Sequence, residues 1–266
     1  MITAELQGRL GNMMFQIATI EYMGHKTGFG SAYPHVDANI EALKKPQACT
    51  SEPEGEKYFG AFKNFDWHKN LDKEILIYST VHVPFGYIPI IPRDNTRYIG
   101  YFQSELNFPD RDFVLNLFEP AEYIQKRLEK YKDAIGTNKA SIHVRRGDYA
   151  KLNSTYHVLG MDYYALAMDC LNTRGIAGYL VFSNDMDWCK ENFVGEQFTF
   201  IHDEDALVEL FLMSKCQDNI IANSAFSWWG AYLNPNPGKV VIAPKKWFNT
   251  PRHDSSNIVP KSWMTI

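Results

Sequence analysis

Short apolar runs rich in β-branched residues alternate with helical patterns through the second half of the chain. The runs cover residues 141–144, 179–182, 198–201, 219–222 and 240–243. Parallel strands need a crossover segment between them, and this alternation is typical of a parallel sheet wrapped by helices. The segment between the third and fourth runs shows the helical spacing i, i+3, i+4, i+7 at Leu207, Leu210, Phe211 and Ser214. The sequence therefore predicts an α/β fold.

The first half is less regular. Residues 2–6 predict a strand, a glycine-containing turn follows, and residues 13–22 form an apolar segment without a helix breaker. Between residues 32 and 97, prolines predict loops and short helices that shape an acceptor surface; they are Pro34, Pro46, Pro53, Pro84, Pro89 and Pro92. A helical stretch at 120–131 leads to a boundary near 135–139. We expect an N-terminal domain at 1–135 and a C-terminal domain at 136–266.

Charge and composition exclude several classes of protein. The chain has 27 basic and 31 acidic side chains in 266 residues, so no global field favours nucleic acid. No window approaches 18 uninterrupted apolar residues, which predicts no transmembrane segment and a cytoplasmic protein. The four cysteines lack metal or disulfide spacing, and we expect reduced thiols at Cys49, Cys170, Cys189 and Cys216.

The run HVRRGDYA at 143–150 places two arginines directly after a predicted buried strand. Arg145 and Arg146 would emerge at its carboxyl end, where open parallel sheets bind ligands. The guanidinium fork matches phosphate oxygens, so a diphosphate-bearing ligand is the first hypothesis. His143 would point toward the same place and could hydrogen-bond the diphosphate or ribose, and Asp148 would orient the arginines or contact the ligand itself. The alternative is an exposed Arg–Asp pair of little energetic consequence.

Two acidic triplets resemble the Asp-x-Asp metal motif. We interpret the triplet at 203–205 as a helix start, since carboxylates there cap a helix and oppose its dipole. Asp185 and Asp187 follow a predicted strand, and Ser183 and Asp185 are candidates for ligand binding. Asp185 either accepts hydrogen bonds from guanine or ribose, or caps a helix together with Ser183 and Asn184. We favour no metal at either triplet.

Two glycine- or serine-containing turns are further candidates for anion binding, because each precedes a predicted helix. The first holds Arg9, Gly11 and Asn12. The second holds Ser224, Ala225, Phe226 and Ser227, and Phe226 is an alternative stacking partner for guanine. The adjacent Trp228 and Trp229 are expected in the core.

Four ordered motifs resemble one enzyme family. GRLGNMMFQIA at 8–18, HVRRGDYA at 143–150, VFSNDMDWCKENF at 181–193 and NSAFSWWGAYLN at 223–234 are similar to signatures of the glycosyltransferase family 11 α-1,2-fucosyltransferases. The resemblance implies a GT-B-type fold of two Rossmann-like domains facing a cleft, with the acceptor on the N-terminal side and GDP-fucose bound by the C-terminal domain. Met13 departs from the family pattern, which usually has Gln there, and the chain is somewhat short.

The resemblance also implies a reaction. L-Fucose would pass with inversion from GDP-β-L-fucose to the 2-hydroxyl of a terminal galactoside in an oligosaccharide or surface glycan. Arg145, assisted by Arg146, would meet the charge on the departing diphosphate without a metal or other cofactor. His143 and Asn12 join Arg145 as catalytic candidates. A general base is not singled out among His157, Asp37 and Asp148.

Two other functions remain open at this point. The chain would otherwise be a related glycosyltransferase with another linkage or nucleotide sugar, or a noncatalytic module that binds nucleotide sugars or glycans. Oligomeric state does not follow from the sequence.

Overall fold

A computed structural model describes residues 1–43, 58, 60–202 and 204–266. The chain divides into two units, the first of residues 1–121 and 253–260, the second of residues 122–252 and 261–266. The boundary expected near 135–139 therefore lies inside the second unit. The reason is that the helical stretch after Ala121 is fastened there: Glu204 forms an ion pair with Arg127 and accepts a hydrogen bond from Tyr131 Oη at 2.8 Å.

The first unit contains a four-stranded parallel sheet in the order β2-β1-β4-β3. Its elements are β1 (Ile2–Ala4), α1 (Leu10–Thr27), β2 (Ser31–Ala32), α2 (Val36–Leu43), β3 (Ser79–His82), β4 (Thr96–Ile99), η2 (Glu105–Asn107) and α3 (Arg111–Leu117). The first strand, the turn and the long helix are confirmed. The region 32–97 was expected to hold only loops and short helices, and its strands β2, β3 and β4 correct that expectation. They are too short for a clear periodic signal, but pairing with β1 and with each other stabilises them.

The second unit contains a six-stranded parallel sheet in the order β10-β9-β8-β5-β6-β7. Its elements are α4 (Glu122–Leu128), η3 (Glu129–Tyr131), β5 (Gly136–Val144), α5 (Gly147–Lys151), α6 (Met161–Leu171), η4 (Asn172–Arg174), β6 (Gly178–Ser183), α7 (Met186–Asn192), β7 (Phe198–Ile201), α8 (Ala206–Ser214), β8 (Cys216–Ile220), α9 (Ala225–Tyr232), β9 (Val241–Ala243) and β10 (Met264–Thr265). All five predicted runs coincide with or overlap strands, and the expected α/β class is confirmed.

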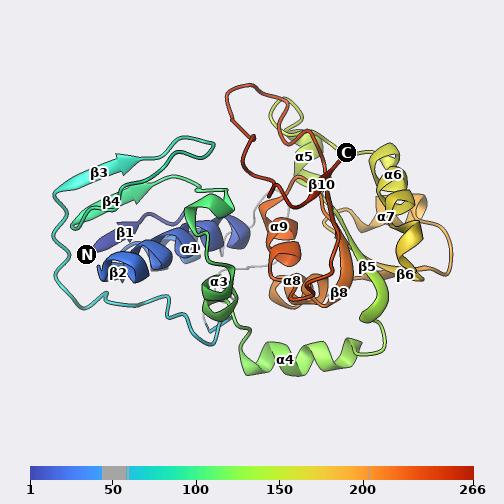
Figure 1. Ribbon diagram of the computed structural model, residues 1–266, viewed down its shortest axis with the longest axis horizontal. Coiled ribbons are helices and arrows are strands. Elements are labelled where there is room, and N and C mark those ends of the chain that lie inside the picture. Colours follow the sequence, from blue (N-terminus) through green and yellow to red (C-terminus); the bar gives the residue numbers. More distant parts are fainter. Residues whose placement is uncertain (44–57, 59, 203) are drawn as a thin grey trace. The chain divides into compact units, whose positions relative to one another are not determined.

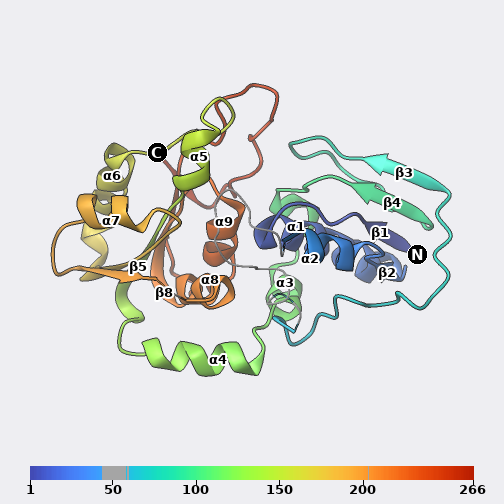
Figure 2. The same cartoon turned by 180° about the vertical axis from the view of Figure 1, so that it is seen from behind.

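Helices cover both faces of this sheet, with α6 and α7 on one side and α8 and α9 on the other (Figure 1). The view from behind in Figure 2 shows the same two layers. Alternate residues of β5 face opposite layers. Ile142 and Val144 belong to the buried cluster that includes residues of α6 and α7, whereas the ring of His143 lies 5.6 Å from that of Phe226 in α9. The strand thus turns His143 toward the helix that follows β8.

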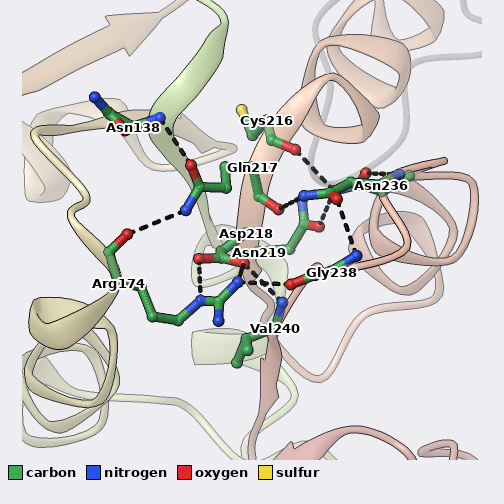
Figure 3. A network of polar contacts seen from close by, with 10 residues as sticks. Asn138, Arg174, Cys216, Gln217, Asp218, Asn219, Asn236, Gly238 and Val240 are labelled. Atoms are coloured by element: carbon green, nitrogen blue, oxygen red, sulfur yellow. Dashed lines mark hydrogen bonds and ion pairs between the residues drawn. The ribbon is translucent and has the colours of Figure 1, made fainter.

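An ion pair between Arg174 and a fully buried carboxylate connects segments on the β8 side of the sheet (Figure 3). Arg174 contacts both oxygens of the fully buried Asp218, at 2.7 and 3.1 Å, and donates to the carbonyl of Gly238. Asp218 also accepts from the backbone amide of Val240 at 2.7 Å. Because a buried charge is tolerated only when it is paired, this network locks η4, β8 and the chain before β9 together.

Three of the four cysteines and the predicted helix start at Asp205 lie within the described residues. Cys170, Cys189 and Cys216 are free thiols, while Cys49 lies outside the described residues, as does Asp203. Asp205 caps α8 by accepting from the amide of Leu207 at 2.9 Å, which confirms that carboxylate as a helix start. Within the described ranges, no helix combines the length and the apolar character that crossing a membrane requires.

Candidate active site

The arginine loop consists of Arg145 and Arg146, directly after β5. It lies where the strand order of the larger sheet reverses. The chain proceeds from β5 to β6 and β7 on one side, then returns to β8 on the other side of β5. The loops after β5 and β8 therefore leave the same edge next to each other, which is the usual ligand-binding position of an open α/β sheet. Arg145 and Arg146 directly follow β5, and Asn223 and Ser224 lie just before α9.

Arg145 is held by a carboxylate in the first turn of α5, that of Asp148. Its Nη2 lies 2.6 Å from Asp148 Oδ2, and both side chains are about one-sixth exposed, at 16% and 15%. Asn184, after β6, donates to the other Asp148 oxygen at 3.1 Å. Gly147 permits this approach, because a Cβ there would lie only 2.9 Å from Asn184 Nδ2. Asp148 consequently joins the loops after β5 and β6.

The pKa of Asp148 reflects opposing influences. Burial raises it, but the Arg145 guanidinium and hydrogen bonds from Arg145, the Asp148 backbone and Asn184 together hold it below its ordinary value. Asp148 is therefore an anion at neutral pH. A carboxylate whose pKa is lowered is a weak general base, so its position suits orientation of Arg145 better than proton abstraction.

Arg146 is fixed from several sides. Its Nη1 donates to the carbonyl of Leu159 at 2.7 Å, its Cζ lies 4.2 Å from the centroid of the Trp188 ring, and its Nε lies 3.9 Å from Asp185 Oδ2. Its backbone amide donates to Asn184 Oδ1 at 3.1 Å. These contacts hold Arg146 in the packing between the loop and α7.

His143 is buried and neutral. Burial, followed by the charge of Arg145, lowers its pKa to about 3 although Asp148 opposes the shift. The imidazole can therefore donate or accept a hydrogen bond at physiological pH but cannot act as a cation. Its Nδ1 is buried and makes no hydrogen bond to any residue that the structure describes.

Asp185 caps a helix and also lies near an arginine. It accepts from the amide of Trp188 at 3.4 Å as the N-cap of α7, so the capping interpretation is confirmed. Ser183 Oγ accepts from the amide of Asp185 at 2.9 Å. About a third of the Asp185 side chain is exposed. Asp187 is exposed in the first turn of α7, and the described residues contain no cluster of three potential metal ligands.

The start of α9 divides its candidates into accessible and buried residues. Ala225 and Phe226 are partly exposed, whereas Ser224 is 5% exposed. Ser227 is fully buried, and its hydroxyl donates to the carbonyls of Ala222 and Ser224 at 3.4 and 3.3 Å. Trp228 and Trp229 are both fully buried, as expected for core residues.

The N-terminal candidates lie in the first unit, at the start of α1. Arg9 is the N-cap of α1 in an extended conformation, and Gly11 is buried in the first turn. Asn12 Oδ1 accepts from the side-chain amide of Gln103 at 2.8 Å. Gln16 stabilises the turn by bonding the amide and the carbonyl of Gln7 at 2.8 and 3.1 Å. Gly8, at φ 76°, is required because a Cβ would lie 2.4 Å from Asn12 Nδ2.

The other two candidate bases are His157 and Asp37. His157 offers its backbone carbonyl to Asn223 at 2.9 Å. Asp37 belongs to the first unit, is 70% exposed and lies 2.9 Å from His68 Nε2. The identity of a general base stays an open prediction.

Three residues without a predicted site role, Asn184, Trp188 and Tyr149, hold the arginine loop together with Asn223, which belongs to the predicted phosphate-binding turn before α9. Asn184 bridges to Asp148, Trp188 packs on Arg146, and Asn223 and Tyr149 join the loops after β5 and β8 by a hydrogen bond of 3.1 Å. Asn184 and Asn223 each follow a predicted strand of the same sheet. That shared position was the available signal, since carboxyl ends of parallel strands meet at one edge.

Comparison with known proteins agrees with the expected family. The sequence model of Glycosyl transferase family 11 matches residues 1–266. The O-antigen biosynthesis glycosyltransferase WbnK of Escherichia coli is 37% identical over 181 residues, covering 63% of this chain and 59% of that protein. An Escherichia coli alpha-1,2-colitosyltransferase is 32% identical, covering 65% and 63%. Human galactoside alpha-(1,2)-fucosyltransferase 1 is 28% identical, covering 85% and 63%. The chain thus spans about 60% of the length of these relatives.

Solved fucosyltransferases share the fold. NodZ alpha-1,6-fucosyltransferase soaked with GDP-fucose gives a TM-score of 0.52 at 11% identity, covering 89% of this chain and 96% of that one. POFUT1 in complex with GDP also gives 0.52 at 11% identity, covering 90% and 97%. These likenesses confirm the GT-B-type α/β fold class. Because the family match extends over the whole chain, the protein belongs to glycosyl transferase family 11.

Proposed function

We propose that this chain transfers L-fucose from GDP-β-L-fucose to the 2-hydroxyl of a terminal galactoside, with inversion at the anomeric carbon. The observation that carries the proposal is the paired arginine loop at the switch point of the larger sheet, with Arg145 held by Asp148 at 2.6 Å. Family membership and the fold shared with fucosyltransferases support it.

Arg145 would act on the leaving group. As the bond from fucose to the diphosphate breaks, negative charge grows on the phosphate oxygen, and a guanidinium positioned beforehand stabilises that charge. Asp148 orients Arg145 while its own lowered pKa keeps the pair ionic at neutral pH. Arg146, fixed by Leu159 and Trp188, would hold the loop in place beside Arg145.

The remaining donor contacts follow from position. Neutral His143 would offer a hydrogen bond to the diphosphate or ribose, and the amides of Ala225 and Phe226 at the start of α9 would face the phosphates. Asp185, whose Oδ1 caps α7, would use its partly exposed carboxylate to accept from guanine. Arg9, Gly11 and Asn12 are proposed for the acceptor side or the donor sugar. No metal is needed in this scheme, because arginine supplies the positive charge.

The direct test is incubation of the purified chain with GDP-fucose and a panel of terminal galactosides, followed by linkage analysis of the product. We expect an α-1,2 linkage and conversion of the donor to GDP. Another linkage would refute the proposed regiochemistry while retaining the enzyme class. GDP binding without transfer to any galactoside would favour a noncatalytic module.

A colitose donor is a second candidate, because a relative with 32% identity is named an alpha-1,2-colitosyltransferase. The same assay should include the colitose nucleotide in competition with GDP-fucose. We expect preferential use of GDP-fucose; preferential transfer of colitose would reassign the donor sugar and leave the arginine-based mechanism intact.

A further inference from the structure

Tyr149 contacts Arg145 and the loop after β8 at the same time. The Cζ atom of Arg145 lies 5.6 Å from the centroid of the Tyr149 ring. The Tyr149 hydroxyl donates to the carbonyl of Asn223 at 3.1 Å. One side chain therefore links the guanidinium after β5 to the segment that opens α9, across the point where the strand order reverses.

The Tyr149 ring is itself firmly held. It stacks on Tyr156 with centroids 4.1 Å apart and planes 11° from parallel, and only 9% of the residue is exposed. Tyr156 forms an isolated antiparallel bridge with Phe248. The ring cannot shift without disturbing these contacts, so it offers Arg145 a fixed surface.

Asn223, whose carbonyl accepts from the Tyr149 hydroxyl, is also fixed in place. Its side-chain amide donates to the carbonyls of His157 and Trp247, at 2.9 and 2.7 Å, and the residue is fully buried. The carbonyl that accepts from Tyr149 therefore belongs to an anchored segment. Because the Tyr149 hydroxyl is bonded to this carbonyl, the fixed position of Asn223 also restricts the Tyr149 ring against which Arg145 lies.

We infer that Tyr149 is a positioning residue that holds the guanidinium of Arg145 where it binds the diphosphate. Its ring contacts the guanidinium, and its hydroxyl donates to the Asn223 carbonyl. The inference rests on the proposed function, in which Arg145 binds that diphosphate. Asp148 fixes Arg145 from the first turn of α5, whereas Tyr149 fixes it relative to the neighbouring loop. Tyr149 acts through Arg145 and makes no contact with the ligand in this scheme.

The test is a double-mutant cycle on GDP binding, measured by titration calorimetry. We expect Tyr149→Leu to weaken GDP binding roughly 3- to 30-fold, the range for loss of a partly buried cation–aromatic contact. Tyr149→Phe keeps the ring and loses only the hydroxyl, so it should weaken binding by a smaller factor. In an Arg145→Ala background both changes should have no further effect, because residues that act through one another are not additive.

Tyr163→Phe is the matched control. Its hydroxyl also donates to buried carbonyls, those of Ile221 at 2.7 Å and Ile242 at 3.2 Å, but Tyr163 belongs to α6 and not to the segment that carries Arg145. Its effect on GDP binding should be close to none even where its stability loss equals that of Tyr149→Phe.

The outcomes distinguish failure of the positioning role of Tyr149 from failure of the proposed function. Losses at Tyr149 that add fully to that of Arg145→Ala, or equal weakening by Tyr163→Phe, would overturn the positioning role while leaving the proposed function standing. An unmodified protein that fails to bind GDP would overturn the proposed function and the positioning role with it. The Tyr149→Phe arm decides the question even where Tyr149→Leu does not fold.

Discussion

Replacing Asp148 by Asn removes a charge while nearly preserving shape. In the structure this carboxylate faces Arg145 at 2.6 Å and accepts from Asn184 at 3.1 Å. The asparagine retains an acceptor oxygen but leaves the guanidinium without its counter-charge. We expect a less stable protein whose arginine loop is less ordered.

The size of the loss follows from the burial of the pair. Charges about 4 Å apart interact by about 4 kcal/mol at an effective dielectric constant of 20. Both side chains remain about one-sixth exposed, so solvent compensates part of that energy. We expect the free energy of unfolding to fall by about 2–3 kcal/mol at pH 7, between the values for exposed and fully buried pairs.

The dependence on pH gives the prediction its sign. Because the pKa of Asp148 is lowered in the folded protein, its ion pair stabilises fully above the ordinary aspartate pKa of about 3.9 and loses this effect as the pH falls through the folded pKa. Urea unfolding should therefore show a constant difference between wild type and Asp148→Asn from pH 8 to pH 5, and a smaller one below pH 4. Exposed Asp187→Asn is the control, with a change under about 0.5 kcal/mol. Equal stability of wild type and Asp148→Asn at pH 7 would refute the reasoning.

Three further predictions concern the core, the histidine and metal. Arg174→Ala should cost about 3–5 kcal/mol in chemical unfolding because it leaves the fully buried Asp218 carboxylate without its counter-charge, and a loss below about 1 kcal/mol would contradict that network. The imidazole resonances of His143 should not titrate between pH 5 and pH 8, since its pKa is lowered to about 3; a midpoint near 6.5 would contradict its burial. Transfer should persist in EDTA, whereas loss of activity restored by Mn²⁺ would make Asp185 and Asp187 candidate ligands.

The buried strands were predictable because their chemistry is local. The apolar run at 179–182 lies within the buried strand β6, and the run at 240–243 overlaps the buried strand β9. The edge strands β3 and β10 were not predictable in the same way. In β3, residues 79–82 alternate between partly exposed and exposed positions, and β10 has only two residues, both exposed. Such strands depend on pairing with a neighbour that is distant in sequence.

The site was predictable at the level of loops but not of contacts. The position after a strand indicated Arg145 and Asp185 correctly as residues at the carboxyl edge. That Asp148 joins two loops through Asn184 depends on the parallel register of β5 and β6, which no local pattern encodes. The burial of Ser227 was not predictable either, since only the packing of α9 shows that its hydroxyl is buried.

The most direct measurement of the central claim is the rate of fucose transfer by folded Arg145→Ala and Arg145→Lys proteins. We predict losses equivalent to about 3–5 kcal/mol for Arg145→Ala, roughly 150- to 5,000-fold, because the charge on the diphosphate would lose its buried partner. Arg145→Lys should recover little, since an ammonium cannot reproduce the bidentate fork. Turnover near the wild-type rate in folded Arg145→Ala would contradict the account.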